Sequence, residues 1–87
     1  MIQPRYLAYA QAHGRTPDEM LAHDRGAWPG GCMTGFMVWV REQWHAWYTE
    51  TGERPEHGSF ASPRQHAALD AWLARRYAAH EQAEMFA

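Results

Sequence analysis

Seven side chains in this sequence of 87 residues are of types that bind metals or act as nucleophiles or bases. They are six histidines and one cysteine: His13, His23, His45, His57, His66, His80 and Cys32. A zinc site usually contains a close pair of ligands, as in C-x₂-C or H-x₃-H spacing, and here no two histidines lie within four residues of each other. The nearest pairing, His66 with Asp70, is weak by itself. We therefore expect no metal and no cofactor.

Cys32 lies in the segment WPGGCMTGF, which runs from Trp28 to Phe36. At a helix N-terminus a thiol pKa falls, and His13 or His23 would then be candidate bases. We favour the other interpretation, in which Cys32 is a small, half-buried residue at a helix junction. A chain of this length also leaves little room for a pocket of several hundred Å³, so we expect no catalytic residue and no enzyme.

The glycines of this segment have two interpretations as well. Their backbone amides could face an anion, but the phosphate-binding pattern G-x-x-x-x-G-K-[ST] is absent and the chain contains no lysine. Pro29-Gly30 fits the two central positions of a type II turn, where glycine supplies a positive φ. We favour the turn.

The elements that position these residues are predicted to be helices, with no period-2 strand pattern. Thr16 and Ser62 are typical N-caps, and Glu19 and Gln65, three residues later, complete capping boxes. The predicted helices run from Pro4 to about His13, from Pro17 to about Arg25, from Cys32 or Met33 to about Thr51, and from Pro63 to about Glu84. Gly14 and Gly52 are expected to end the first and third helices, and Gly26 followed by Trp28-Pro29-Gly30-Gly31 is expected to end the second. The sequence predicts an all-α fold, a single domain over residues 1–87, and a small bundle of about four helices whose third and fourth are long.

The third helix carries an apolar stripe and two residues that do not fit it. The stripe, at helical spacing, consists of Met33, Phe36, Met37, Val40, Trp44, Trp47 and Tyr48. Trp39 and Val38 point elsewhere. Either this helix is central and touches neighbours on several sides, which we favour, or Trp39 is an exposed partner contact. Trp28, on the preceding turn, is open to the same two interpretations.

The fourth helix also has two faces. Its predicted core face consists of Ala68, Leu69, Trp72, Leu73, Ala79, Ala83 and Phe86. Arg76 falls near the middle of that face and is expected to snorkel to its edge rather than to pair with an acid. A second row, Ala67, Ala71, Ala74 and Ala78, either faces water, which we favour, or forms a homodimer seam.

The composition narrows the class of protein. A net charge of −2 and a pI near 6.3 make direct nucleic-acid binding unfavourable. The apolar start of the third helix also argues against a DNA-recognition helix. A single cysteine fits a reducing cytoplasm. No apolar run approaches about 18 residues, so we expect no membrane span, and the N-terminus lacks the long apolar segment of a signal peptide.

The span from Arg5 to Trp47, about half the chain, resembles short proteins encoded in phages and prophages of GC-rich bacteria. The resemblance rests on HGRTPDEML (13–21), Asp24, PGG (29–31), Met33, Gly35-Phe36 and Trp39. No activity or functional residue is assigned to that group. The resemblance implies a small cytoplasmic accessory protein, made during infection of a bacterial host, that acts by stoichiometric binding to a host factor such as a CRISPR effector.

We therefore predict a non-enzymatic interaction protein that binds a host protein complex, with inhibition of a defence system such as CRISPR as its implied role. The predicted partner-binding residues are Trp28, Trp39, Arg75 and Arg76. The alternative is a nucleic-acid-associated or transcription-linked regulatory module that acts through arginines such as Arg64, Arg75 and Arg76.

Overall fold

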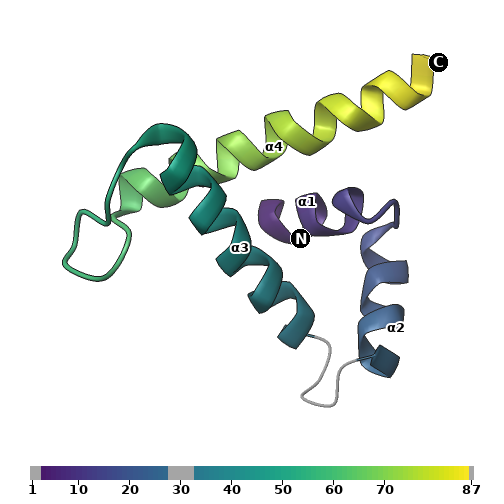
Figure 1. The fold of residues 1–87 in the computed structure, drawn as a ribbon. Coiled ribbons are helices and arrows are strands. Elements are labelled where there is room, and N and C mark those ends of the chain that lie inside the picture. Colours follow the sequence, from purple (N-terminus) through teal and green to yellow (C-terminus); the bar gives the residue numbers. More distant parts are fainter. Residues whose placement is uncertain (1–2, 28–32, 87) are drawn as a thin grey trace.

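Four helices make up the structure of this chain, a computed structural model that describes residues 3–27 and 33–86, with side chains as far as residue 77. They are α1 (Pro4–Ala12), α2 (Pro17–Ala27), α3 (Met33–Thr51) and α4 (Pro63–Phe86) (Figure 1). The described residues form no strand, only an isolated bridge between His57 and Phe60. The predicted all-α fold with long third and fourth helices is confirmed. Trp28, Cys32 and the predicted turn between them lie outside the described residues.

Both predicted capping boxes are present. The Thr16 hydroxyl accepts a hydrogen bond from the Glu19 amide at 3.2 Å, and the Glu19 carboxylate accepts one from the Thr16 amide at 2.9 Å. These two bonds hold the pKa of Glu19 below its usual value. Ser62 and Gln65 make the same reciprocal pair at 3.2 and 3.0 Å. The starts of α2 and α4 are therefore fixed by residues three positions apart.

The predicted glycine ends of α1 and α3 are present. Gly14 and Gly52 have φ values of +68° and +73°, which only glycine adopts without strain. The helix α2 ends at Ala27, close to its predicted end near Arg25, and the rest of the predicted stop, Trp28 to Gly31, lies outside the described residues.

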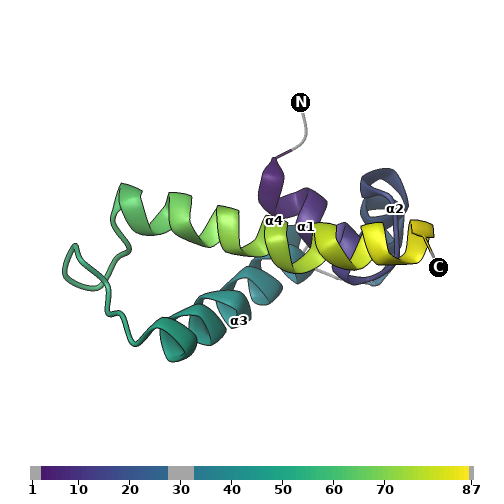
Figure 2. The same cartoon turned by 90° about the horizontal axis from the view of Figure 1, so that it is seen from above.

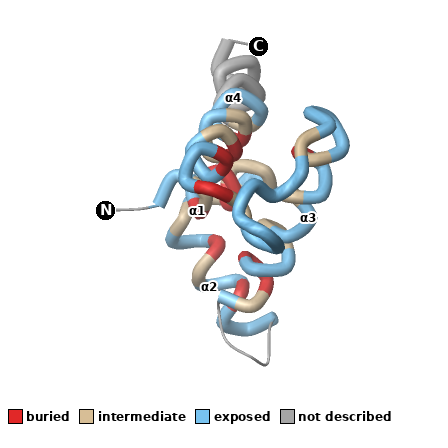
Figure 3. The backbone as a smooth tube through the Cα atoms, turned by 90° about the vertical axis from the view of Figure 1, so that its left-hand side faces the viewer, coloured by how far each residue is buried: buried red, intermediate tan, exposed pale blue. Residues whose placement is uncertain are grey.

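The helix α1 is the central element of the fold. It lies in the angle between α3 and α4 and packs against all three other helices, while α2 crosses its far end (Figures 1 and 2). The buried parts of α1, α2 and α4 face inward, whereas most of the loop between α3 and α4 is exposed (Figure 3). None of the described helices combines the length and the apolar content needed to cross a membrane.

The core consists of two clusters of buried side chains. The first cluster joins α1, α2 and α3 and contains Tyr6, Tyr9, Ala10, Met20 and Phe36. The second joins α1, α3 and α4 and contains Ala8, Trp47, Leu69 and Leu73. Trp39 packs against both clusters. Its ring centroid lies 5.3 Å from that of Tyr9 in α1 and 5.7 Å from that of Tyr77 in α4. Trp39 therefore joins the two halves of the core.

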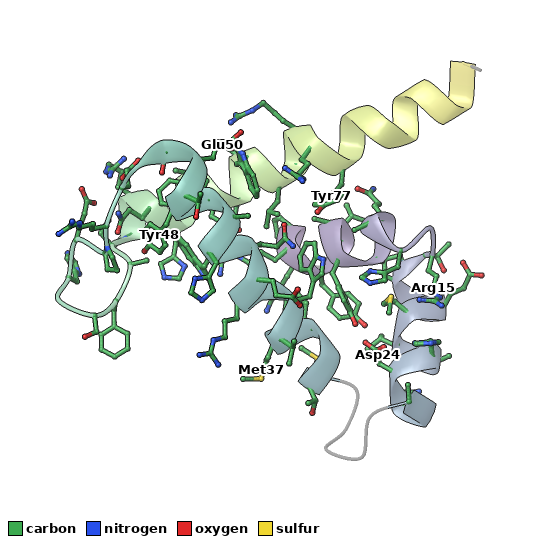
Figure 4. The ribbon with its side chains drawn as sticks, viewed as in Figure 1. Arg15, Asp24, Met37, Tyr48, Glu50 and Tyr77 are labelled. Carbon is green, nitrogen blue, oxygen red and sulfur yellow. The ribbon has the colours of Figure 1, made fainter. Side chains whose placement is uncertain are left out.

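This position corrects the hypothesis that Trp39 lies on an exposed patch. The side chain is only partly exposed, because α3 touches neighbours on more than one side, which was the favoured interpretation. The stripe needs a correction as well: Phe36 and Trp47 are buried, but Met33 and Met37 are 45% and 67% exposed. Met37 projects from α3 away from α1 and α2 (Figure 4).

A buried carboxylate connects α2 to α1. Asp24 is fully buried, and it accepts a hydrogen bond from the Tyr9 hydroxyl at 2.7 Å. Its other oxygen lies 3.1 Å from Nδ1 of His23. A buried carboxylate without partners would be strongly destabilising, so these bonds select one arrangement of α2 against α1.

The Tyr9–Asp24 pair predicts a loss of stability at alkaline pH. Burial, and then the hydrogen bond to Asp24, raise the pKa of Tyr9 well above its usual value. The folded chain keeps a proton that the unfolded chain releases, so this contribution is complete below about pH 10 and is lost as the pH rises further. In urea titrations Tyr9→Phe should be about 1.5–3 kcal/mol less stable near neutral pH, because Asp24 loses a donor. It should then lose less stability than the wild type between about pH 9 and 11. Parallel pH profiles would contradict this assignment.

Trp39→Ala should be strongly destabilising. Removing a large ring that contacts both clusters is expected to cost about 3 kcal/mol, measured by chemical unfolding followed by far-UV circular dichroism. Met37→Ala on the same helix is the control, and its exposed side chain should cost less than about 0.5 kcal/mol. Equal stabilities of the two variants would show that Trp39 does not hold the core together.

Candidate functional site

The residues predicted to carry chemistry are not gathered into one centre in the described part of the chain. Within it, no three His, Cys, Asp or Glu side chains come close enough together to hold a metal ion. His13 is occupied locally, with Nδ1 2.8 Å from the carbonyl oxygen of Tyr9. His23 lies beside Asp24. The structure thus shows a local hydrogen-bond partner for each of these two histidines.

The pair His66 and Asp70, one turn apart on α4, does have a common partner. Arg5 of α1 donates from Nε to Asp70 Oδ1 at 2.5 Å and from Nη2 to His66 Nδ1 at 2.8 Å. Because a guanidinium only donates, His66 Nδ1 must be the acceptor. The same guanidinium lies over the Trp44 ring, 5.3 Å from its centroid. This contact fixes Trp44 between α1 and α4.

The predicted partner-binding arginines lie on the outer side of α4. Arg75 and Arg76 are exposed, and the Arg76 guanidinium stacks over Trp72 at 5.0 Å from the ring centroid. This agrees with the predicted snorkelling of Arg76 to the edge of the core. Trp72 in turn donates from its indole nitrogen to Glu50.

The alanine row of α4 is exposed as far as its side chains are described. This holds for Ala67, Ala71 and Ala74, whereas the Ala78 side chain lies outside the described part. Exposure fits both interpretations of the row, so the homodimer seam stays a prediction.

Two adjacent hollows lie along the outer face of α3. The α1–α3 hollow, of about 340 Å³, is lined by Gln3, Arg5, Phe36, Met37, Val40, Arg41 and Trp44. The loop hollow, of about 330 Å³, is lined by Arg41, Trp44, His45, Tyr48, Pro55, Ser59, Phe60, Ala61 and His66. Arg41 and Trp44 line both. We call the two hollows together the α3 surface.

Two large apolar side chains of the α3 surface are unusually exposed. Met37 is 67% exposed in the α1–α3 hollow, and Phe60 is 76% exposed in the loop hollow. Sequence analysis placed Met37 in the core and did not single out Phe60. A phenylalanine in an otherwise polar loop was the available signal. Large exposed apolar groups beside hollows are typical of binding surfaces.

The loop that carries Phe60 has a fixed conformation. Residues 57–60 form a tight turn in which the backbones of His57 and Phe60 exchange two hydrogen bonds, each of 3.0 Å. Gly58 in this turn has a φ of +67°. Phe60 is therefore presented by an ordered backbone.

The buried side-chain amide of Gln65, in α4, holds the same loop by hydrogen bonds. It is fully buried, and all four hydrogen-bonding positions of its amide are used. Its oxygen accepts from the backbone amides of Glu56 and Ser62, each at 3.0 Å, and its nitrogen donates to Arg54 O at 2.8 Å and Glu53 Oε1 at 3.3 Å. The predicted capping residue therefore also holds the loop in place.

Exposed ion pairs add to the brace. Arg64 contacts Glu53 Oε1 at 2.5 Å and Glu56 Oε2 at 2.9 Å. The hydrogen bonds from Arg64 and then Ser62 hold the pKa of Glu56 below its usual value. The Arg64 side chain is 58% exposed, so solvent screens these pairs.

Comparison of the chain with protein-family models, with curated proteins and with solved structures gave no match. The resemblance to phage-encoded proteins stays a prediction, as does the nucleic-acid alternative.

Gln65→Ala should loosen the loop and destabilise the fold by about 2–3 kcal/mol, because buried backbone donors lose their acceptor. Hydrogen exchange should show faster exchange at Glu56 and Ser62. The control, Arg64→Ala, removes only exposed ion pairs and should cost less than about 1 kcal/mol. If Gln65→Ala costs no more than Arg64→Ala, the buried amide does not brace the loop.

Proposed function

We propose that this chain is a small non-enzymatic interaction protein that binds another protein through the α3 surface. The observation that carries the proposal is the pair of adjacent, largely apolar hollows, each with an exposed apolar side chain, Met37 in one and Phe60 in the other. Protein interfaces gain most of their affinity from a few such anchors that seat in hollows. The ordered loop supports the same role, because it presents Phe60 before a partner arrives.

The site differs from the one proposed from sequence. The Trp39 side chain packs against both core clusters. We therefore propose Met37 and Phe60, in place of Trp39, as the residues that contact the partner.

The nature of the partner comes from the resemblance described above. It favours a protein complex of a bacterial host, and inhibition of a defence system such as CRISPR is the role we propose. A small protein that acts by stoichiometric binding needs a surface with anchors and no catalytic centre, and the α3 surface fits that need.

The proposal predicts which substitutions abolish binding. The tagged wild-type chain, Met37→Ser and Phe60→Ser should be used to capture proteins from a lysate of a GC-rich bacterium, and each captured protein should then be purified and rebound. We expect each substitution to weaken binding of the true partner by about tenfold or more, since anchors of this kind contribute over 1 kcal/mol. The stability of both variants should stay within about 1 kcal/mol of wild type, because the side chains are exposed.

Leu7→Ser is the matched control. Leu7 is an apolar residue of α1, 40% exposed, that lines neither hollow. Its substitution should leave the affinity unchanged. A partner that binds Met37→Ser and Phe60→Ser as tightly as the wild type would show that the α3 surface is not the binding site.

A further inference from the structure

The charged residues that line the α3 surface are both arginines. Arg5 and Arg41 line the α1–α3 hollow, and Arg41 also lines the loop hollow, beside the imidazoles of His45 and His66. None of the residues that line either hollow is acidic.

The two arginines, Arg5 and Arg41, are not equally available to a partner. Arg5 is held by Asp70 at 2.5 Å, which compensates its charge. Arg41 is exposed, and its guanidinium makes no hydrogen bond or ion pair with any other residue of the described part of the chain. Glu42 follows it in α3 but lies about 100° around the helix, outside both hollows. Arg41 thus stands between the two hollows as a free cation that a carboxylate of a partner would complement.

The spacing of the hollows suits two side chains of a helix. The α3 residues that line the α1–α3 hollow run from 36 to 44, and those that line the loop hollow run from 41 to 48. The two sets are centred roughly five residues apart, which is about 7 Å along a helix axis. Side chains at positions i and i+4 of a helix are separated by about 6 Å along its axis, so one helix can place an anchor in each hollow.

The architecture of the described part of the chain favours a helical partner over one that binds by adding a strand. Extended segments usually bind by adding a strand to a sheet edge, and the described part of this chain has no sheet. Each hollow, at about 330–340 Å³, falls within the range for small-molecule sites, which corrects the expectation that a chain of this length leaves little room for such a pocket.

We infer that the α3 surface takes an acidic amphipathic helix of the partner protein. This helix seats two apolar side chains, one turn apart, in the two hollows and places an Asp or Glu carboxylate against Arg41. The inference rests on the proposed function, since it names the chemistry of the partner for the same surface.

The test is a selection that does not require the natural partner. A displayed library of 18-residue helical peptides, with randomised positions on every face, is selected in parallel against the full-length wild type and against Arg41→Glu. The wild type should select helices with apolar residues at i and i+4 and an adjacent Asp or Glu. The variant Arg41→Glu should select Lys or Arg at that position and bind the acidic helices at least about tenfold more weakly.

Arg25→Glu provides the control for charge. Arg25 is an exposed arginine of α2 that lines neither hollow, so its reversal should change the affinity of the selected helices by less than about twofold, a long-range screened effect. An equal loss with Arg25→Glu and Arg41→Glu would overturn the inference, because the attraction would then come from net charge alone.

Two further outcomes separate this inference from the proposed function. Helices that lose binding to Met37→Ser and Phe60→Ser but are not acidic would overturn the inference and leave the proposed function intact. Helices that bind these two variants as well as wild type would overturn both.

A wild-type dimer that Met37→Ser dissociates in sedimentation velocity would show that a second copy covers the surface, which would also overturn the inference.

Discussion

The hydrogen bond from the Tyr9 hydroxyl to the buried carboxylate of Asp24 is the contact on which the arrangement of the helices depends. A fully buried carboxylate requires such a donor, so α2 can pack in only one way against α1. The ring of the same tyrosine contacts Phe36 and Trp39 of α3. Trp39 carries the packing on to Tyr77 of α4. Tyr9 of the central helix thus makes both the hydrogen bond that orients α2 and the ring contacts through which α3 and α4 pack.

Features decided by neighbouring residues were predictable from the sequence. The capping boxes at Thr16 and Ser62 involve residues three positions apart, so the sequence alone contains both partners of each bond. The same local signals placed the end of α2 near Arg25, and the helix ends at Ala27.

The α3 surface was not predictable from the sequence, because it depends on which residues of α3 the other helices cover. Helical periodicity puts Met37 on the same face as Phe36, yet α1 covers Phe36 and leaves Met37 exposed. Likewise, the spacing of His66 and Asp70 drew attention to the pair but could not reveal Arg5, more than 60 residues earlier in the chain. The exposed Phe60 depends on a turn whose two flanking residues, Glu56 and Ser62, are hydrogen-bonded to Gln65. Helical periodicity reveals none of these arrangements.

The bracing of the loop by Gln65 has a consequence for the entropy of binding. The Gln65 amide bonds the loop backbone at residues 54, 56 and 62, and residues 57 and 60 close the turn between them, so the loop loses conformational freedom once, when the chain folds. A partner that contacts Phe60 then meets a side chain with only its own rotations left to lose. The entropy cost of ordering this loop therefore arises when α4 folds. A disordered binding loop would incur that cost each time it bound a partner.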